Sequence, residues 1–284
     1  MDQAKIKIEH ILEKGSGRIN EDRLVMEKNL FGVFDGATSL DGACFGDACT
    51  GGGIAADTAR QVFSRNHTSL DFLGRSANAA ILAKMKTHKV CLNRPESRWS
   101  TSAAVVRISD NRLEWLQTGD AFVLLIHTDN SYRVLVDQED HDFETLCLLK
   151  KEQNKTLSNP VLKTQIKKIR SNMNKTYGVL NGDPEAEKFM HTGFAGLDRV
   201  QTILLFTDGL AVPSETPEKK KKFTPLVDLF QRKGLRGLHR HIRQREKQDP
   251  NLNRFPRFKC HDDIAAIAIH LFPSSDTSGA VRDR

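Results

Sequence analysis

The sequence contains no uninterrupted apolar run of about 18 residues, the length that a membrane-spanning helix requires. Its first ten residues carry charges where a secretory signal peptide needs an apolar stretch, so secretion is not expected. Cysteine is scarce: there are five, an odd number, and none forms a CxxC pair. This argues against a disulfide framework and against a structural zinc site. We therefore expect a cytoplasmic protein with ordinary thiols.

The composition gives little support to disorder or to nucleic-acid binding. With 38% hydrophobic residues over 284 positions, the chain can bury a substantial core. The net charge of +7 raises the question of nucleic acid, but there is no zinc-finger spacing, no RNP motif and no aromatic interleaving. Much of the excess charge lies in residues 219–222 and 232–247. We interpret these as a solvated loop and helix face, with docking of an acidic partner as the alternative.

Apolar periodicity predicts strands and helices in blocks, without regular alternation. Strands are expected at 5–12, 23–27, 30–34, 102–108, 112–117, 121–127, 132–136, 188–191, 201–206 and 264–271. Helices are expected after the glycine run 51–53, at 70–88 and at 226–244, whereas 150–175 shows no clear period. This order favours an α+β fold with antiparallel sheets. We assign residues 1–272 to one domain and expect 273–284 to be a disordered tail.

Five short acidic motifs lie beside the predicted strands. They are Asn20-Glu21-Asp22, Phe34-Asp35-Gly36, Gly119-Asp120-Ala121, Thr207-Asp208-Gly209 and His261-Asp262-Asp263. Two motifs follow a strand and three precede one, and in an antiparallel sheet the end of one strand neighbours the start of the next. The five motifs are therefore predicted to share one edge. For any single motif, a simple turn or capping role is the alternative.

The first two motifs can be placed more closely. If residues 23–27 and 30–34 form a hairpin, paired positions sum to 57 and Asp22 faces Asp35. Directly opposed side chains have Cβ atoms about 4.5–5.5 Å apart. Carboxylates this close repel each other unless a proton or a cation neutralises them. Oxygen-only ligands suit Mg²⁺ or Mn²⁺, and several carboxylates are what a two-metal hydrolytic site requires.

The ordered set of motifs resembles the PPM-type (type 2C) metal-dependent serine/threonine protein phosphatases. The matching elements are NED, VFDG, Ser100-Thr101, GDA, Asp140-His141, TDGL and DD, from about Arg18 to Ile269. The resemblance implies a sandwich of two antiparallel β-sheets with helices outside and a metal cleft at one end. It also implies hydrolysis of phosphoserine or phosphothreonine in proteins by a metal-activated water. Two Mn²⁺ or Mg²⁺ ions are implied, with a third, weaker ion in many members.

Carried over onto this sequence, the resemblance assigns roles to the acids. Asp35 looks like the carboxylate that bridges both metals, and Gly36 like the residue whose carbonyl ligates one of them. Asp208 and Asp262 are similar to the ligands of the other metal. Glu21 would act through the second metal or its water. Asp35, Asp208 and Asp262 are therefore the predicted catalytic acids.

Other residues either correspond to supporting residues of the family or differ from the residue usual at their position. Asp120 is similar to the acid of the additional metal, and Asp22 to a residue that orients waters or neighbouring groups. Asp263 stands where asparagine is often found. Arg18 resembles the phosphate-binding arginine, at a spacing one residue short. Ala37 replaces a histidine that many eukaryotic members have as a plausible general acid and that bacterial relatives often lack.

The predicted partners are a phosphoprotein substrate and a partner kinase, with neither membrane nor nucleic acid, and a monomer is favoured. Residues 149–183 correspond to the variable flap region, where substrate choice is usually set in the family. One alternative is a non-catalytic relative that binds phosphoproteins; it would have lost a metal-ligating acid, and none is missing here. The other is a similar hydrolase that acts on a small phosphorylated molecule.

Overall fold

The computed structural model describes residues 5–38, 40, 44–45, 49–151 and 159–272. The strands are β1 (Lys5–Glu13), β2 (Arg23–Glu27), β3 (Leu30–Gly36), β4 (Cys44–Phe45), β5 (Cys49–Thr50), β6 (Thr101–Ser109), β7 (Arg112–Thr118), β8 (Phe122–His127), β9 (Tyr132–Val134), β10 (His191–Gly196), β11 (Val200–Phe206) and β12 (Ile264–Phe272). The helices are α1 (Gly51–Phe63), α2 (Leu70–Thr87), α3 (Phe143–Lys151), α4 (Pro160–Arg170) and α5 (Thr224–Lys247). Short 3₁₀ turns lie at Pro95–Ser97, Pro184–Phe189 and Asp208–Leu210.

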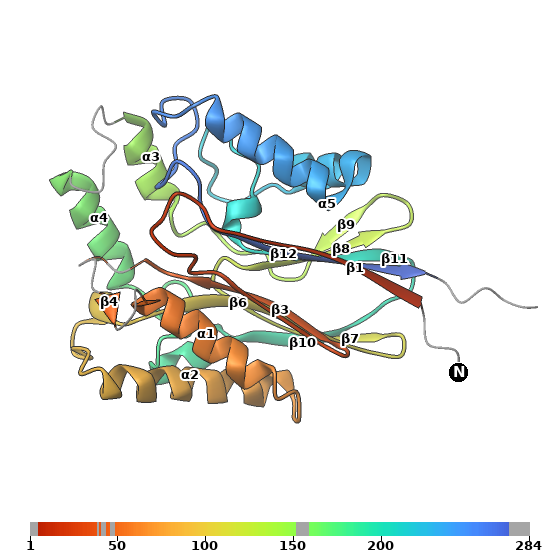
Figure 1. The fold of residues 1–284 in the computed structure, drawn as a ribbon, viewed down its shortest axis with the longest axis horizontal. Coiled ribbons are helices and arrows are strands. Elements are labelled where there is room, and N and C mark those ends of the chain that lie inside the picture. The colour runs from red at the N-terminus through yellow and green to blue at the C-terminus, as the bar shows by residue number, and fades with distance from the viewer. Residues whose placement is uncertain (1–4, 39, 41–43, 46–48, 152–158, 273–284) are drawn as a thin grey trace, which may run out of the picture.

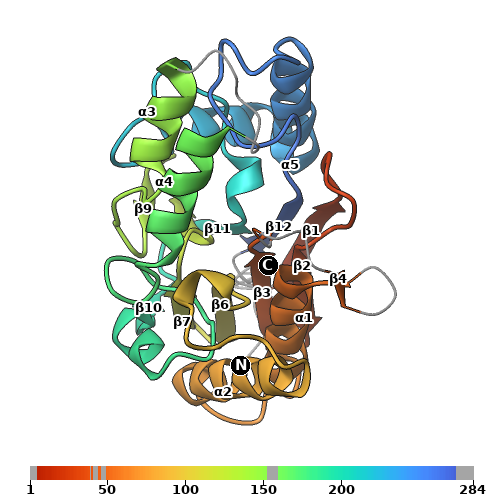
Figure 2. The same cartoon turned by 90° about the vertical axis from the view of Figure 1, so that its left-hand side faces the viewer.

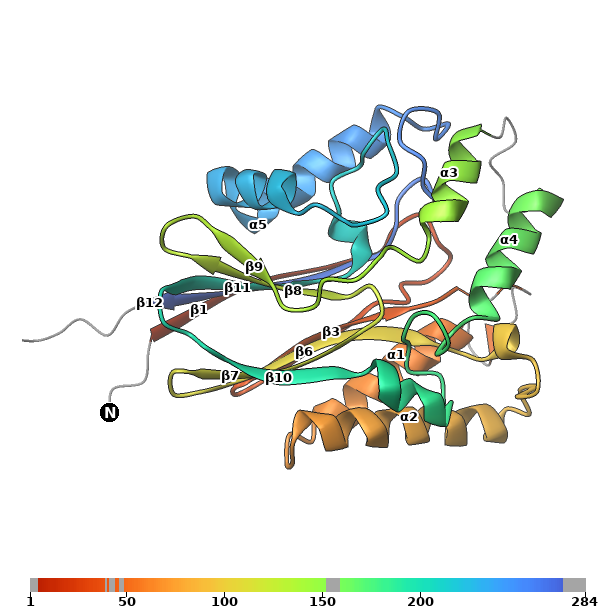
Figure 3. The ribbon, with the colours of Figure 1, turned by 180° about the vertical axis from the view of Figure 1, so that it is seen from behind.

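Two five-stranded antiparallel sheets lie face to face, with α5 on one outer face and α1 and α2 on the other (Figure 1). The first sheet has the order β1-β12-β11-β8-β9 and the second the order β10-β7-β6-β3-β2. Figure 3 shows the side of the molecule where β9 and β10 form the edges of the two sheets. The predicted α+β sandwich is confirmed. The expected C-terminal tail, 273–284, lies outside the described residues.

Alternation of side chains along the strands produces the layers. In β12, Ala265, Ile267 and Ile269 pack into the core between the two sheets. The intervening Ala266 and Ala268 pack in the cluster that joins this sheet to α5. Because both faces of the central strands are buried, their sequences are nearly continuous apolar runs, which the sequence pattern detects.

The first sheet is covered by α5, which is bent at Gly234, where φ is 66° and ψ is 179°. Phe230 and Leu238 pack toward the sheet, while Arg232 and Arg236 are exposed. The basic helix face is therefore solvated at these positions, whereas Arg243, which the prediction counts among the solvated residues, is buried and pairs with Glu13 and Glu246. Of the helices in the described part of the chain, none combines the length and the apolar composition that crossing a membrane requires.

Several elements differ from the sequence prediction, among them α3, for which no helix is predicted. The pattern predicts a strand at 188–191, but Pro184–Phe189 forms a 3₁₀ turn and the strand begins at His191. Residues 150–175 show no clear period, yet they contain α4. Within α4, Leu162 is buried and Ile166 and Ile169 are half-buried, so an apolar stripe at helical spacing is present in the sequence, and the prediction overlooks it among the surrounding lysines.

Candidate active site

The β2–β3 hairpin brings the first two acidic motifs together. Arg23 pairs with Phe34, so the register predicted from the sequence is confirmed. Asp22 immediately precedes β2. Asp35 lies one residue beyond Phe34, the last residue of β3 that pairs with β2. Burial raises the pKa of Asp35 well above its usual value, and the charge of Asp22 adds to this rise. The two carboxyls therefore interact as neighbours.

A cavity of about 260 Å³ is lined in part by residues of α4. Figure 2 shows α4 at one end of the sandwich. The walls of the cavity include Asp35, Gly36, Asp120, Asp208 and Asp262. These residues come from four of the five motifs, which are far apart in sequence. The predicted convergence of acids at one edge is thus what the structure shows.

The carboxyls in this cavity repel one another. Burial, followed by repulsion from Asp262 and Asp120, raises the pKa of Asp208 to about 7. The pKa of Asp22 is also raised well above its usual value, first by burial and then by neighbouring acids, although Thr207 opposes this with a hydrogen bond of 2.7 Å. Like charges withdrawn from water disfavour the ionised form, so additional positive charge in the cavity would favour the ionised carboxylates.

The remaining motif is Asn20-Glu21-Asp22, and its Glu21 contacts residues next to the cavity, among them the lining residue Thr38. The carboxylate of Glu21 accepts hydrogen bonds from the hydroxyls of Thr38 and Thr50, the latter at 2.5 Å. Its backbone N–H donates to Oδ2 of Asp263 at 2.7 Å. The other oxygen of Asp263 accepts from the N–H of Gly15, also at 2.7 Å. Asp263 therefore fixes the backbone that carries Glu21, whereas Glu21 itself is not among the residues lining the cavity.

Gly36 permits a close approach of three segments at the end of β3. A Cβ atom there would lie 2.5 Å from the carbonyl oxygen of Gly52, at the start of α1, and 2.7 Å from that of Glu21. Both neighbours are backbone atoms, which cannot move aside cheaply. The glycine in the Asp-Gly motif is therefore required by packing, whatever its carbonyl binds.

Asp120 lies in a smaller cluster on the far side of the cavity. Ser102 donates a hydrogen bond of 2.5 Å to Oδ1 of Asp120. His141 stacks on Tyr177 with ring centroids 4.0 Å apart, and its Nε2 is 3.7 Å from Oδ2 of Asp120. Asp120, His141 and Asp142 can each offer a ligand atom, all within 4.8 Å of one another. This cluster could hold a further cation.

Two lysines in the site are not predicted from the sequence. Lys259 places Nζ 2.8 Å from Oδ1 of Asp262 and lines the cavity. Lys221 belongs to the basic run interpreted as a solvated loop, but its side chain is only 23% exposed and lies 3.7 Å from Asp140. Burial acts to raise the pKa of Asp120, but the charges of His141 and Lys221 outweigh burial and hold this pKa below its usual value.

The solvated-loop interpretation holds for the flanking residues of this run and is wrong for Lys221. Lys220 and Lys222 are exposed and pair with Asp137 and Glu218 at 2.7 and 3.0 Å. Nothing local in a run of four lysines distinguishes the one that points inward. Lys259 could have been found from the sequence, because it stands three residues before the predicted ligand Asp262.

Arg18 is not brought to the cavity. It lies in the connection between β1 and β2, is exposed, and is not among the lining residues. Its role in binding phosphate stays a prediction for the substrate complex.

The donor set fits hard divalent cations. The cavity offers carboxylate oxygens from four segments, and the raised pKa values of Asp35 and Asp208 show that these charges are not balanced. Carboxylate and carbonyl oxygens are the ligands that Mg²⁺ and Mn²⁺ prefer. A bound cation would favour the ionised carboxylates that burial and repulsion oppose.

Comparisons with known proteins agree with this geometry. A family model described as protein phosphatase 2C matches residues 14–244. No curated protein matches the sequence. Among solved structures, the catalytic domain of the serine/threonine phosphatase PstP in complex with two manganese ions is 17% identical. Its TM-score is 0.58, and the match covers 94% of this chain and 98% of that one.

Two further structures share the fold. PppA of Pseudomonas aeruginosa is 14% identical with a TM-score of 0.58, covering 94% of this chain and 98% of that one. The serine/threonine phosphatase Stp1 from Staphylococcus aureus is 14% identical with a TM-score of 0.56, covering 96% and 98%. Because the family model spans most of the sequence, the chain belongs to the protein phosphatase 2C family of serine/threonine protein phosphatases.

Proposed function

We propose that this protein hydrolyses phosphoserine and phosphothreonine in proteins, at a site that holds two divalent cations, Mn²⁺ or Mg²⁺. The observation that carries the proposal is the set of carboxyls from four distant motifs around one cavity, with the pKa values of Asp35 and Asp208 raised by burial and repulsion. The PstP structure with two manganese ions supports the choice and number of ions. A cytoplasmic location and a monomeric state stay predictions.

The ligands we propose are the acids of the cavity wall. Asp35, Asp208 and Asp262 would hold the ions, together with the carbonyl of Gly36. Glu21 would contribute through a water, because both of its carboxylate oxygens are bonded to threonine hydroxyls. The Asp120 cluster would take a third, weaker ion. When bound, the cations supply a water of lowered pKa for attack on phosphorus and offset the charge of the phosphoryl group.

The protein's own residues prepare the site and hold the substrate. Asp263 fixes the backbone of Glu21, and Thr207 orients Asp22, so the acids are placed before substrate arrives. Lys259 lies on the cavity wall, where its ammonium group can turn from Asp262 to a phosphate oxygen. Ala37 has no proton to donate, so the general acid that this position supplies in many eukaryotic members is absent here.

The test is hydrolysis of phosphoserine and phosphothreonine peptides with Mn²⁺, after removal of metals with EDTA. We expect turnover only with added metal, and loss of turnover in Asp35→Ala with the fold retained by circular dichroism. Asp228→Asn, an exposed change on α5, is the matched control and should keep full activity. Full activity in chelator would contradict the proposal.

The same assay separates the two alternatives. Small phosphorylated metabolites are run beside the peptides at equal concentration. A higher kcat/KM for a small phosphorylated metabolite than for every peptide would favour the small-molecule phosphohydrolase over the protein phosphatase. Failure to turn over p-nitrophenyl phosphate and every peptide with Mn²⁺ would favour a non-catalytic phosphoprotein-binding role.

A further inference from the structure

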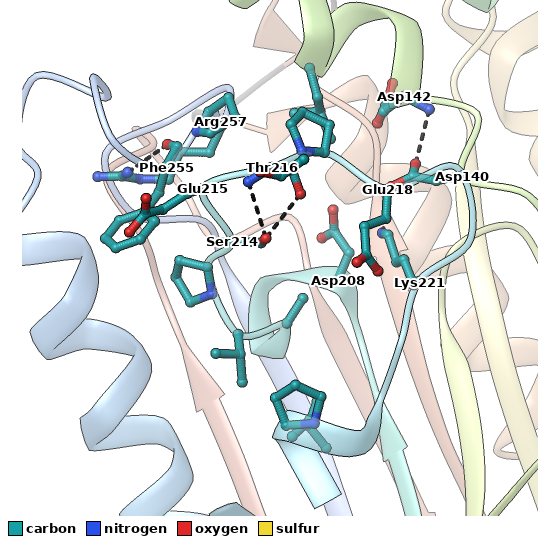
Figure 4. Close-up of a pocket in the computed structure, with 18 of the residues that line it drawn as sticks. Asp140, Asp142, Asp208, Ser214, Glu215, Thr216, Glu218, Lys221, Phe255 and Arg257 are labelled. Atoms are coloured by element: carbon teal, nitrogen blue, oxygen red, sulfur yellow. Dashed lines mark hydrogen bonds and ion pairs between the residues drawn. The ribbon is translucent and has the colours of Figure 1, made fainter. Parts of the chain in front are cut away.

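A second and larger cavity, of about 620 Å³, adjoins the catalytic cavity (Figure 4). The two cavities share Asp142, Asp208, Phe258, Lys259 and Asp262 in their walls. A ligand with its phosphate between these residues can therefore extend from one cavity into the other. A phosphorylated side chain bound in the first cavity would leave the second for other parts of the same substrate.

Two segments that contain none of the predicted catalytic residues form much of the wall of the second cavity. Residues 211–226 continue from the turn that carries Asp208, and residues 255–259 lead toward Asp262. The apolar lining includes Val212, Pro213, Pro217, Phe223, Phe255 and Pro256. Such a lining favours an apolar group, because burial removes apolar surface from water on both partners.

Three charged side chains that line this cavity already have ion-pair partners. Glu218 pairs with Lys222 at 3.0 Å, and Arg257 pairs with Asp249 at 2.9 Å. Glu215 pairs in the same way with an arginine at 2.7 Å. A charged ligand group would have to break these pairs, whereas an apolar side chain would not. Where the apolar residues and these ion pairs line the cavity, they favour an uncharged, apolar occupant.

One polar group at the cavity lacks a partner within the described part of the chain. The Nε–H of Arg245 is buried without a hydrogen-bond acceptor, and its guanidinium lies 4.5 Å from the centre of the Phe255 ring. Arg245 is one of the lining residues. A buried donor without an acceptor is unfavourable, and a peptide carbonyl in the cavity would satisfy it.

We propose that this second cavity is the subsite that binds an apolar side chain of the phosphoprotein substrate, within about three residues of the phosphorylated serine or threonine. The proposal rests on the proposed phosphatase function, since it supplies the phosphate anchor. It assigns part of the substrate selectivity to the loops 211–226 and 255–259, outside the predicted flap region, 149–183.

The test compares phosphoserine peptides that differ at one flanking position, with Leu in one peptide and Gly in the other. Each position within three residues of the phosphoserine is scanned with Mn²⁺ present. At one or more positions, we expect kcat/KM to be about tenfold to a hundredfold higher for Leu than for Gly. Val212→Trp, which fills the cavity, should bring this ratio close to one while the all-Gly peptide is hydrolysed as before.

Two further variants keep the test decisive. Pro256→Trp fills the cavity from the other wall and should act like Val212→Trp if that variant folds poorly. Val161→Trp, at a 51% exposed site on α4 that lines neither cavity, is the matched control and should keep the wild-type ratio. A Leu-to-Gly ratio near one at every position of the wild-type protein would overturn the subsite while leaving the phosphatase function intact. No hydrolysis of any peptide would instead overturn the phosphatase function.

Discussion

The ammonium group of Lys259 lies 2.8 Å from Oδ1 of Asp262, on the wall of the cavity that we propose holds divalent cations. A positive charge beside a ligand repels an incoming cation. We therefore expect Lys259→Met to bind Mn²⁺ about fivefold more tightly, equivalent to ~1 kcal/mol, measured by titration calorimetry. Lys259→Arg keeps the charge and should bind Mn²⁺ as the wild type does. Weaker Mn²⁺ binding by the Met variant would show that Lys259 supports the site.

The carboxyl of Asp35, a ligand in the proposed metal site, is expected to lower the stability of the metal-free protein. Its carboxyl is surrounded by Asp22, Asp208, Asp120 and Asp262, and burial with this repulsion raises its pKa. Asp35→Asn removes one of the charges, so we expect the metal-free protein to gain ~1–2 kcal/mol in free energy of unfolding at pH 8 while activity is lost. Urea unfolding in EDTA measures the change.

The matched control for this change is Asp228→Asn, an exposed site on α5, which should alter stability little. A loss of stability in Asp35→Asn would show that the carboxylate makes stabilising interactions that outweigh the repulsion.

The stability of the metal-free protein should fall as pH rises. The pKa of Asp208 is raised to about 7 in the folded state from an ordinary value of 3.8. Between about pH 4 and pH 7 the folded protein therefore holds a proton that the unfolded chain has released. This contribution is complete below pH 4 and is lost as pH rises through 7, at no more than ~1.4 kcal/mol per pH unit for one carboxyl.

Denaturant unfolding in EDTA at several pH values between 5 and 8 checks this trend. Asp208→Asn should have a flatter profile, since it removes the titrating group. Asp35 and Asp22, whose pKa values are also raised, contribute with the same sign. A wild-type profile that rises over this range would exclude protonated acids in the folded, metal-free site.

Asp263 should matter for stability more than for chemistry. It is 4% exposed and accepts hydrogen bonds of 2.7 Å from the N–H groups of Gly15 and Glu21. Asp263→Ala leaves two N–H groups without their acceptor, so we expect the free energy of unfolding to fall by ~2–4 kcal/mol. Asp263→Asn keeps one acceptor oxygen and should lose about half as much. Equal stability of the Ala variant, measured by urea unfolding, would contradict this role.

The sequence alone is sufficient for those features that depend on near neighbours in the chain. The register of β2 with β3 follows from a short turn and a period of two, and this register by itself places Asp22 beside Asp35. The apolar runs of buried strands and the acids at their ends indicate antiparallel sheets and the edge where the acids lie, whereas the sandwich is implied by the family resemblance. Helix α4 is missed although Leu162, Ile166 and Ile169 recur at helical spacing, because the lysines and arginines nearby mask this stripe when composition is weighed.

Only the tertiary structure decided which loops meet around the acids. It turned Lys221 inward from a run of similar lysines, set Lys259 against Asp262, and left Arg18 exposed away from the cavity. It also joined two loops into a second cavity. The physical reason is that strand register and apolar period arise from local geometry. The direction of a loop side chain depends instead on the charge and packing of segments that are distant in sequence.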